Sequence, residues 1–163
     1  MKYEEWDAYD RHLNRIPGET LVRGEPIPEG MYHLVSDVIV RHTDGTWLLM
    51  QRDRKKNWGG MWEATAGGSA LRGESAYACA ERELAEETGI TDAELEQVGV
   101  LISHAYHTIF AEYLCVTDQA KDTIALQEGE TQAYKWVTTE ELRQMKRNEL
   151  ITERMQGFLQ ELR

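Results

Sequence analysis

The chain has 163 residues, enough for one domain with a well-formed core. Its formal net charge of −11 argues against a nucleic-acid polymer or an acidic membrane as a partner, because binding to either requires basic patches. The negative charge does not exclude a nucleotide as a ligand, because metal ions can neutralise its phosphates locally. Because the sequence has no signal peptide, no membrane-length apolar run and no disulfide framework, we expect a cytoplasmic protein without a membrane partner.

Residues 1–31 hold all three prolines of the chain and predict turns and short strands rather than a long helix. Tyr3, Trp6 and Tyr9 recur every three residues. This spacing indicates either a short helical turn that packs its aromatic face on the domain or a lid over a pocket. We interpret residues 1–31 as an N-terminal extension packed on the main body.

The next two segments are rich in β-forming residues. Residues 32–41 and 46–52 flank the turn TDG and predict a β-hairpin. The second strand leads into residues 51–56, the densest positive patch of the chain. Because the forked donors of arginine match phosphate oxygens, Arg52 and Arg54 are candidate phosphate contacts, and the alternative is a solvated loop.

Residues 57–69 form a loop with two tryptophans and four glycines. A loop of this type stacks Trp58 on a ligand or simply covers an edge of the core. Gly67 and Gly68 lack side chains, so the backbone there can approach a phosphate or another chain segment closely.

Residues 75–88 contain no Gly or Pro and are rich in Ala, Glu, Arg and Leu, so we expect a helix that ends at Gly89. Glu83, Glu86 and Glu87 stand at i, i+3 and i+4 and share one face. Three carboxylates on one face repel each other unless they lie in solvent or surround a cation, and Mg²⁺ and Mn²⁺ prefer oxygen donors. The pattern predicts a divalent-metal site, and the alternative is a solvated Glu-rich helix.

The remaining positions of this helix predict packing and support. Arg82 can hold Glu83 or Glu86 in place by a charge-assisted hydrogen bond. Glu74 is half a turn out of phase with Glu83, so we interpret it as a helix-start residue rather than a metal ligand. A separate face carries small apolar residues that predict packing on a sheet: Ala76, Ala80 and Leu84.

Two further strands are predicted at residues 95–104 and 108–117. His104, Tyr106 and His107 lie around the turn between them. A histidine in such a place is ordinarily a packed or surface residue, and contact with a substrate is the alternative.

The last segments predict one strand and two helices. Residues 133–137 alternate like a strand, and Thr138 with Glu141 three residues later is a capping box at a helix start. Residues 149–163 place apolar side chains on one helical face and predict a core-covering helix.

Residues 68–90 carry a longer motif. It runs Gly, five residues, Glu, seven residues, Arg-Glu-aliphatic, one residue, Glu-Glu, one residue, Gly-aliphatic, and is supplied by Gly68, Glu74, Arg82, Glu83, Leu84, Glu86, Glu87, Gly89 and Ile90. This stretch resembles the Nudix box, with no departure. The resemblance implies an α/β fold, the Nudix α/β/α sandwich with a mixed β-sheet in which the box forms a loop, a helix and a loop. It also implies a single Nudix domain over residues 1–163 and hydrolysis, dependent on Mg²⁺ or Mn²⁺, of a small-molecule nucleoside diphosphate derivative or a related organic pyrophosphate.

The resemblance also implies roles for individual residues. Glu130 stands six residues before Trp136, where many Nudix hydrolases supply an additional metal ligand or base, and the alternative is an acidic loop residue. Nudix relatives carry a Gly, any, Trp, Glu pattern before the box, so Trp62 is expected to be structural. The expected metal ligands are Glu83, Glu86, Glu87 and Glu130. The expected catalytic residues are Glu83, Glu86 and Arg82, and the expected substrate-binding residues are Arg52, Arg54, Trp58 and Gly68.

A second, softer likeness involves the N-terminal half, where residues 6–10 and 23–33 look like the Nudix subgroup most similar to isopentenyl diphosphate isomerase. The isomerases carry a catalytic Cys, a Gly and a metal-binding His where this chain has Ala66, Gly67 and Gly68, so a hydrolase is favoured over the isomerase alternative. A third hypothesis is a non-catalytic module that senses a nucleotide; such a module would be expected to lose metal-binding carboxylates, and none is missing. The substrate and the oligomeric state, including a homodimer, stay open.

Overall fold

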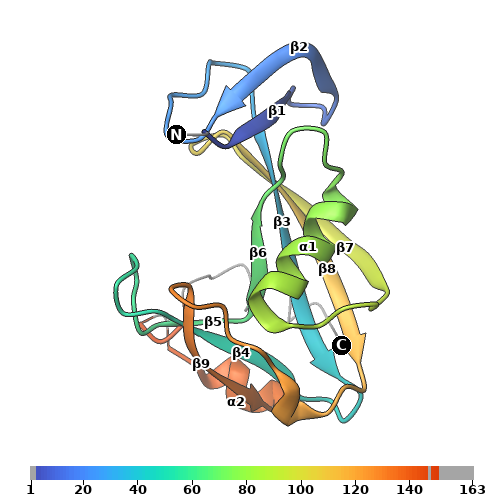
Figure 1. Cartoon of the computed structure of the whole chain (residues 1–163), viewed down its shortest axis with the longest axis vertical. Coiled ribbons are helices and arrows are strands. Elements are labelled where there is room, and N and C mark those ends of the chain that lie inside the picture. The colour runs from blue at the N-terminus through green and yellow to red at the C-terminus, as the bar shows by residue number, and fades with distance from the viewer. Residues whose placement is uncertain (1–2, 147, 151–163) are drawn as a thin grey trace.

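The computed structural model describes residues 3–146 and 148–150. This described part of the chain forms a two-stranded antiparallel sheet and a seven-stranded mixed sheet with two α-helices (Figure 1). The smaller sheet consists of β1 (Glu5–Tyr9) and β2 (Arg15–Val22). The larger sheet contains β3 (His33–His42), β4 (Trp47–Arg52), β5 (Trp62–Glu63), β6 (Thr65–Ser69), β7 (Leu95–Ser103), β8 (Thr108–Thr117) and β9 (Thr131–Val137). The helices are α1 (Ala76–Thr88) and α2 (Thr139–Gln144), and η1 (Lys121–Thr123) is a short 3₁₀ turn.

The N-terminal segment forms a strand where a helical turn was one expectation. In an extended segment a spacing of three places successive side chains on opposite faces. Trp6 is accordingly buried and stacks on the ring of His33 with centroids 4.3 Å apart, whereas Tyr3 is exposed. The prediction of a helical aromatic face was therefore wrong, while the prediction of short strands and turns is confirmed.

The hairpin predicted from residues 32–52 is confirmed only beside its turn. β3 and β4 pair through Arg41 and Trp47, and the two strands then separate. β3 instead pairs with β6 on one side, antiparallel, and with β8 on the other, parallel. β4 pairs with β5 and β9, so that the two strands of the hairpin belong to different parts of one bent sheet.

The sheet is covered on both faces, which confirms the sandwich. Val38 and Val40 of β3 point into a core shared with Ala80 and Leu84 of α1. Ile39, between them, points the other way into a second core with Leu142 of α2. This alternation is the period of two expected of a strand buried on both faces. The predicted small-residue face of α1 is therefore the face that packs on the sheet.

The predicted ends of the elements agree with the local signals. The Ser75 hydroxyl accepts a hydrogen bond from the Ala78 N–H at the start of α1, and Gly89 ends the helix with φ +78°. Thr138 and Glu141 form the expected capping box of α2. Of the helix predicted for residues 149–163, residues 151–163 lie outside the described part of the chain. No helix in the described part is both long and apolar enough to span a membrane.

Candidate active site

A cleft of about 360 Å³ opens between the β1–β2 hairpin, the box helix α1 with β6, and the ends of β4 and β9. Figure 1 shows the hairpin at one end of the molecule and β4, β5 and β9 at the other, with α1 and β6 between them. Seven acidic side chains line the cleft: Glu4, Asp37, Glu63, Glu83, Glu86, Glu87 and Glu130. Four basic side chains line it as well: Arg23, Arg52, Lys56 and Arg82. Such a mixture suits an anionic ligand together with a cation.

The base of the cleft is the contact between β6 and α1. A Cβ atom at Gly68 would lie 2.4 Å from Glu83 Oε1, so this position accepts no side chain without displacing the carboxylate. The Gly67 N–H donates a hydrogen bond to Glu87 Oε2 over 3.3 Å. The glycine pair noted in the sequence therefore lets the backbone of β6 lie directly against two glutamates of the box.

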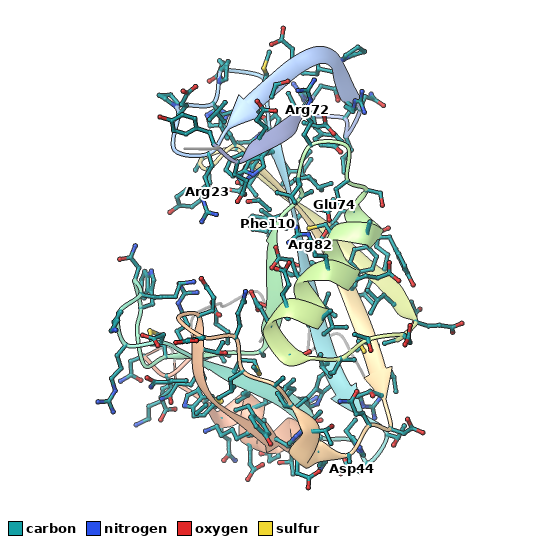
Figure 2. All side chains as sticks on the ribbon, viewed as in Figure 1. Arg23, Asp44, Arg72, Glu74, Arg82 and Phe110 are labelled. Carbon is teal, nitrogen blue, oxygen red and sulfur yellow. The ribbon has the colours of Figure 1, made fainter. Side chains whose placement is uncertain are left out.

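Arg82 links the carboxylates of the box. Its Nε and one terminal nitrogen bind both oxygens of Glu74, at 2.8 and 3.0 Å, a bidentate pair. Its other terminal nitrogen donates to Glu83 at 2.8 Å and to Glu86 at 3.3 Å. Figure 2 shows Arg82 of α1 close to Glu74, which precedes the start of this helix. Glu74 thus anchors Arg82, a support role that helix phase alone did not reveal.

Two box glutamates and a third from β5 have raised pKa values. Burial, followed by the neighbouring carboxylates of Glu83 and Glu63, raises the pKa of Glu87 to about 8. Burial also raises the pKa of Glu83, although Arg82 opposes the shift, and that of Glu63, although Arg52 opposes it. Buried acids that repel one another favour either a proton or a cation.

The opposite wall of the cleft comes from the loop after β4 and the start of β9. Arg52 donates from one terminal nitrogen to Glu63 Oε1 at 2.8 Å and from Nε to the Asn57 carbonyl at 2.9 Å. Lys56 forms an ion pair with Glu130. Sequence reasoning missed Glu63, although it belongs to the Gly, any, Trp, Glu pattern before the box.

The carboxylates of the cleft are not arranged as a preformed metal-coordination site. Within residues 3–146 and 148–150, no group of three or more His, Cys, Asp or Glu side chains is arranged to coordinate one metal ion. Arg82 engages Glu83 and Glu86, and Lys56 engages Glu130. The donors nevertheless fit a hard divalent cation, because all are carboxylate oxygens, and a cation would relieve the repulsion and burial that raise the pKa values of Glu83 and Glu87.

Some predicted residues lie elsewhere. Arg54 and Trp58 are not among the residues that line the cleft, and Trp58 is 67% exposed. His104 hydrogen-bonds the Tyr32 hydroxyl at 2.7 Å, and His107 hydrogen-bonds the Met31 carbonyl at 3.1 Å, so both have structural partners.

The positions relevant to the isomerase alternative hold no thiol. Ala66 is a buried residue of β6. Cys79 and Cys115 are free and buried, and burial raises the pKa of each thiol to about 11. Neither sulfur lines the cleft described above. A thiol at such a pKa is a poor acid or nucleophile near neutral pH.

Comparisons with known proteins agree with this geometry. The NUDIX domain model matches residues 31–161. The chain is 35% identical over 141 residues to an uncharacterised Nudix hydrolase of Listeria monocytogenes, an alignment that covers 85% of this chain and 82% of the relative. It is 38% identical over 87 residues to an isopentenyl-diphosphate Delta-isomerase of Halorhodospira halophila, covering 52% of this chain and 49% of the isomerase.

The fold has close counterparts among solved structures. The crystal structure of the Deinococcus radiodurans protein DR0079 superposes with a TM-score of 0.77 and covers 97% of this chain and 98% of its own, at 14% identity. The family model, the Listeria relative and the shared fold lead to one assignment: the chain belongs to the Nudix family and is a pyrophosphohydrolase.

Proposed function

We propose that the cleft hydrolyses the pyrophosphate linkage of a nucleoside diphosphate derivative or a related organic pyrophosphate, with Mg²⁺ or Mn²⁺ as cofactor. One arrangement carries the proposal. Glu83 and Glu87 lie against the glycines of β6 at the bottom of the cleft, and Arg52 and Lys56 line the opposite wall. Half-buried carboxylates at the bottom of the cleft, opposite a wall with basic side chains, fit a pyrophosphate that binds together with a metal ion.

The residues that would hold the metal are Glu83, Glu86, Glu87 and Glu130. A bound divalent ion supplies Lewis-acid polarisation of the phosphoryl oxygens and lowers the pKa of water. Binding would require Glu83, Glu86 and Glu130 to exchange part of their present hydrogen bonds with Arg82 and Lys56. Since a metal ligand must be deprotonated, binding would also release the proton that Glu87 retains near neutral pH.

The protein groups then divide the remaining work. Arg82, anchored by Glu74, holds Glu83 and Glu86 in position. One of the box glutamates accepts the proton of the attacking water. Arg52 and Lys56 stabilise the negative charge that develops on the phosphoryl oxygens.

The test is to replace the two half-buried glutamates, Glu83 and Glu87, one at a time. Glu83→Gln and Glu87→Gln should each lower kcat by roughly 100-fold or more while the thermal midpoint shows an intact fold. Glu81→Gln is the matched control, because Glu81 is exposed on the same helix and does not line the cleft. Near-normal metal-dependent turnover in both Glu83→Gln and Glu87→Gln would contradict the proposed roles of these glutamates.

A substrate panel distinguishes the alternatives. Nucleoside triphosphates, nucleotide sugars, dinucleotides, CoA esters and prenyl diphosphates are incubated with Mg²⁺ or Mn²⁺, and product masses identify the broken P–O bond. The local identity to an isomerase motivates adding isopentenyl diphosphate, for which Ala66 and the buried thiols argue against a reaction. Thermal stabilisation by a compound without release of phosphate across the panel would instead indicate a sensing module.

A further inference from the structure

The N-terminal hairpin contributes to the cleft although it lies outside the segment that matches the family model. The matched segment is residues 31–161, whereas β1 and β2 span residues 5–22. Glu4 and Arg23, which flank this hairpin, both line the cleft. The hairpin is therefore a part of this chain's active site that the matched family model does not cover.

The hairpin is tied to the box itself. The Arg72 N–H donates to the Glu5 carbonyl at 2.9 Å, and the Gly73 N–H donates to a carboxylate oxygen of the buried Asp7 at 2.8 Å. The Arg72 side chain adds an ion pair with Glu5. Residues 71–73 connect β6 to α1, so these bonds hold the hairpin against the loop that opens the box. A hairpin held in this way can position a side chain over the cleft.

A short relay of side chains positions Arg23. The buried Trp6 donates from its indole N–H to Glu4 Oε1 at 2.8 Å. The other oxygen of Glu4 accepts a hydrogen bond from Arg23 at 3.1 Å. The Arg23 side chain keeps 69% of its surface exposed, so most of its donors remain open to a ligand. Figure 2 shows Arg23 extending from the hairpin on the side where β6 lies.

The other basic residues of the cleft are more enclosed. The side chains of Arg52 and Arg82 are 21% and 26% exposed, and each is engaged with box or wall carboxylates. Lys56 is 30% exposed and paired with Glu130. Arg23 therefore presents the most accessible positive charge of the cleft, across from the wall that carries Arg52 and Lys56.

The lining is otherwise almost entirely polar. Among the described residues that line the cleft, none is aromatic and Leu71 supplies the one large aliphatic side chain. Stacking of a base or burial of a prenyl tail would need apolar surface, which this lining hardly provides. A compact, hydrophilic ligand with several anionic groups suits the lining better.

We propose that Arg23 is a specificity-determining residue that binds a second anionic group of the substrate, a phosphate beyond the pyrophosphate that the box holds. The substrates of this enzyme are then compact polyphosphorylated compounds rather than prenyl diphosphates. This inference rests on the proposed function, since it assumes that the box binds the pyrophosphate.

Two non-hydrolysable probes test it by binding alone. Imidodiphosphate and diimidotriphosphate differ by one phosphate group, and their Kd values are measured by calorimetry with Mg²⁺. The wild type should bind diimidotriphosphate roughly tenfold or more tightly than imidodiphosphate, the ratio expected of one charge-assisted hydrogen bond. Arg23→Ala should abolish most of this ratio while leaving the Kd of imidodiphosphate within about twofold, and Arg23→Lys should recover part of it.

Arg11→Ala is the control for net charge, because Arg11 is exposed in the β1–β2 turn and does not line the cleft. It should keep the wild-type ratio. Equal affinity of the wild type for the two probes, or an unchanged ratio in Arg23→Ala, would overturn the inference and leave the proposed function standing. Failure of both probes to bind, together with no hydrolysis of any pyrophosphate, would overturn both.

Discussion

Glu87 has a strongly raised pKa, and removing its charge should change stability in a pH-dependent way. Its pKa is about 8 in the folded chain against an ordinary value of 4.5, because of burial and the carboxylates of Glu83 and Glu63. Between these pH values the folded chain holds a proton that the unfolded chain has lost. The free energy of unfolding therefore falls as pH rises from about 4.5 to about 8. Glutamine has the same shape but does not ionise, so Glu87→Gln should remove this fall.

The two pKa values set the size of the effect. Each pH unit of difference between the folded and unfolded pKa corresponds to about 1.36 kcal/mol, so the full loss approaches about 5 kcal/mol. This is a large part of the stability of an ordinary domain, about 5–15 kcal/mol. Metal-free Glu87→Gln should be roughly 1 kcal/mol more stable than the wild type near pH 5 and roughly 4 kcal/mol more stable at pH 8.

Urea unfolding in the presence of a chelator, at pH 5, 6.5 and 8, measures the difference. Glu81→Gln, exposed on the same helix, should follow the wild type at every pH. Added Mg²⁺ should then stabilise the wild type more than Glu87→Gln at pH 8, because only the wild type offers this carboxylate as a ligand. Unfolding free energies of the wild type and Glu87→Gln that stay parallel between pH 5 and 8 would refute the reasoning.

Two further predictions concern the support of the box. Gly67→Ala should destabilise the fold by roughly 1–3 kcal/mol in urea unfolding, because its Cβ would lie 2.4 Å from a backbone oxygen of β3. Gly68→Ala should instead chiefly lower kcat, because its Cβ would meet the carboxylate of Glu83, which can move. Arg82→Lys should lower kcat/KM by roughly tenfold or more with little change in KM, because an ammonium group cannot reproduce the bidentate pair with Glu74 while holding Glu83. Equal losses of stability in the two glycine variants, or full activity in Arg82→Lys, would contradict these expectations.

The sequence alone determined the elements whose signals are local. The box helix begins after Ser75 and ends at Gly89 because a cap and a left-handed glycine act within one turn of the helix. The strand at residues 131–137 follows from alternation, and the capping box at Thr138 follows from a spacing of three. The spacing of the box glutamates identified the family before any contact was known. These features were predictable because the interacting groups are close together along the chain.

The tertiary structure decided which distant segments meet. No local signal shows that β3 runs parallel to β8 with β6 on its other side, since strand pairing depends on burial across the whole sheet. The lining of the cleft also depends on which segments meet. Arg54 and Trp58 were candidate ligand contacts but do not line it, whereas Glu63 from β5 and Arg23, next to the N-terminal hairpin, do. The spacing of the box glutamates along the chain is visible in the sequence. Which charged side chains lie opposite them depends on the tertiary structure, because electrostatic contacts act through space and not along the chain.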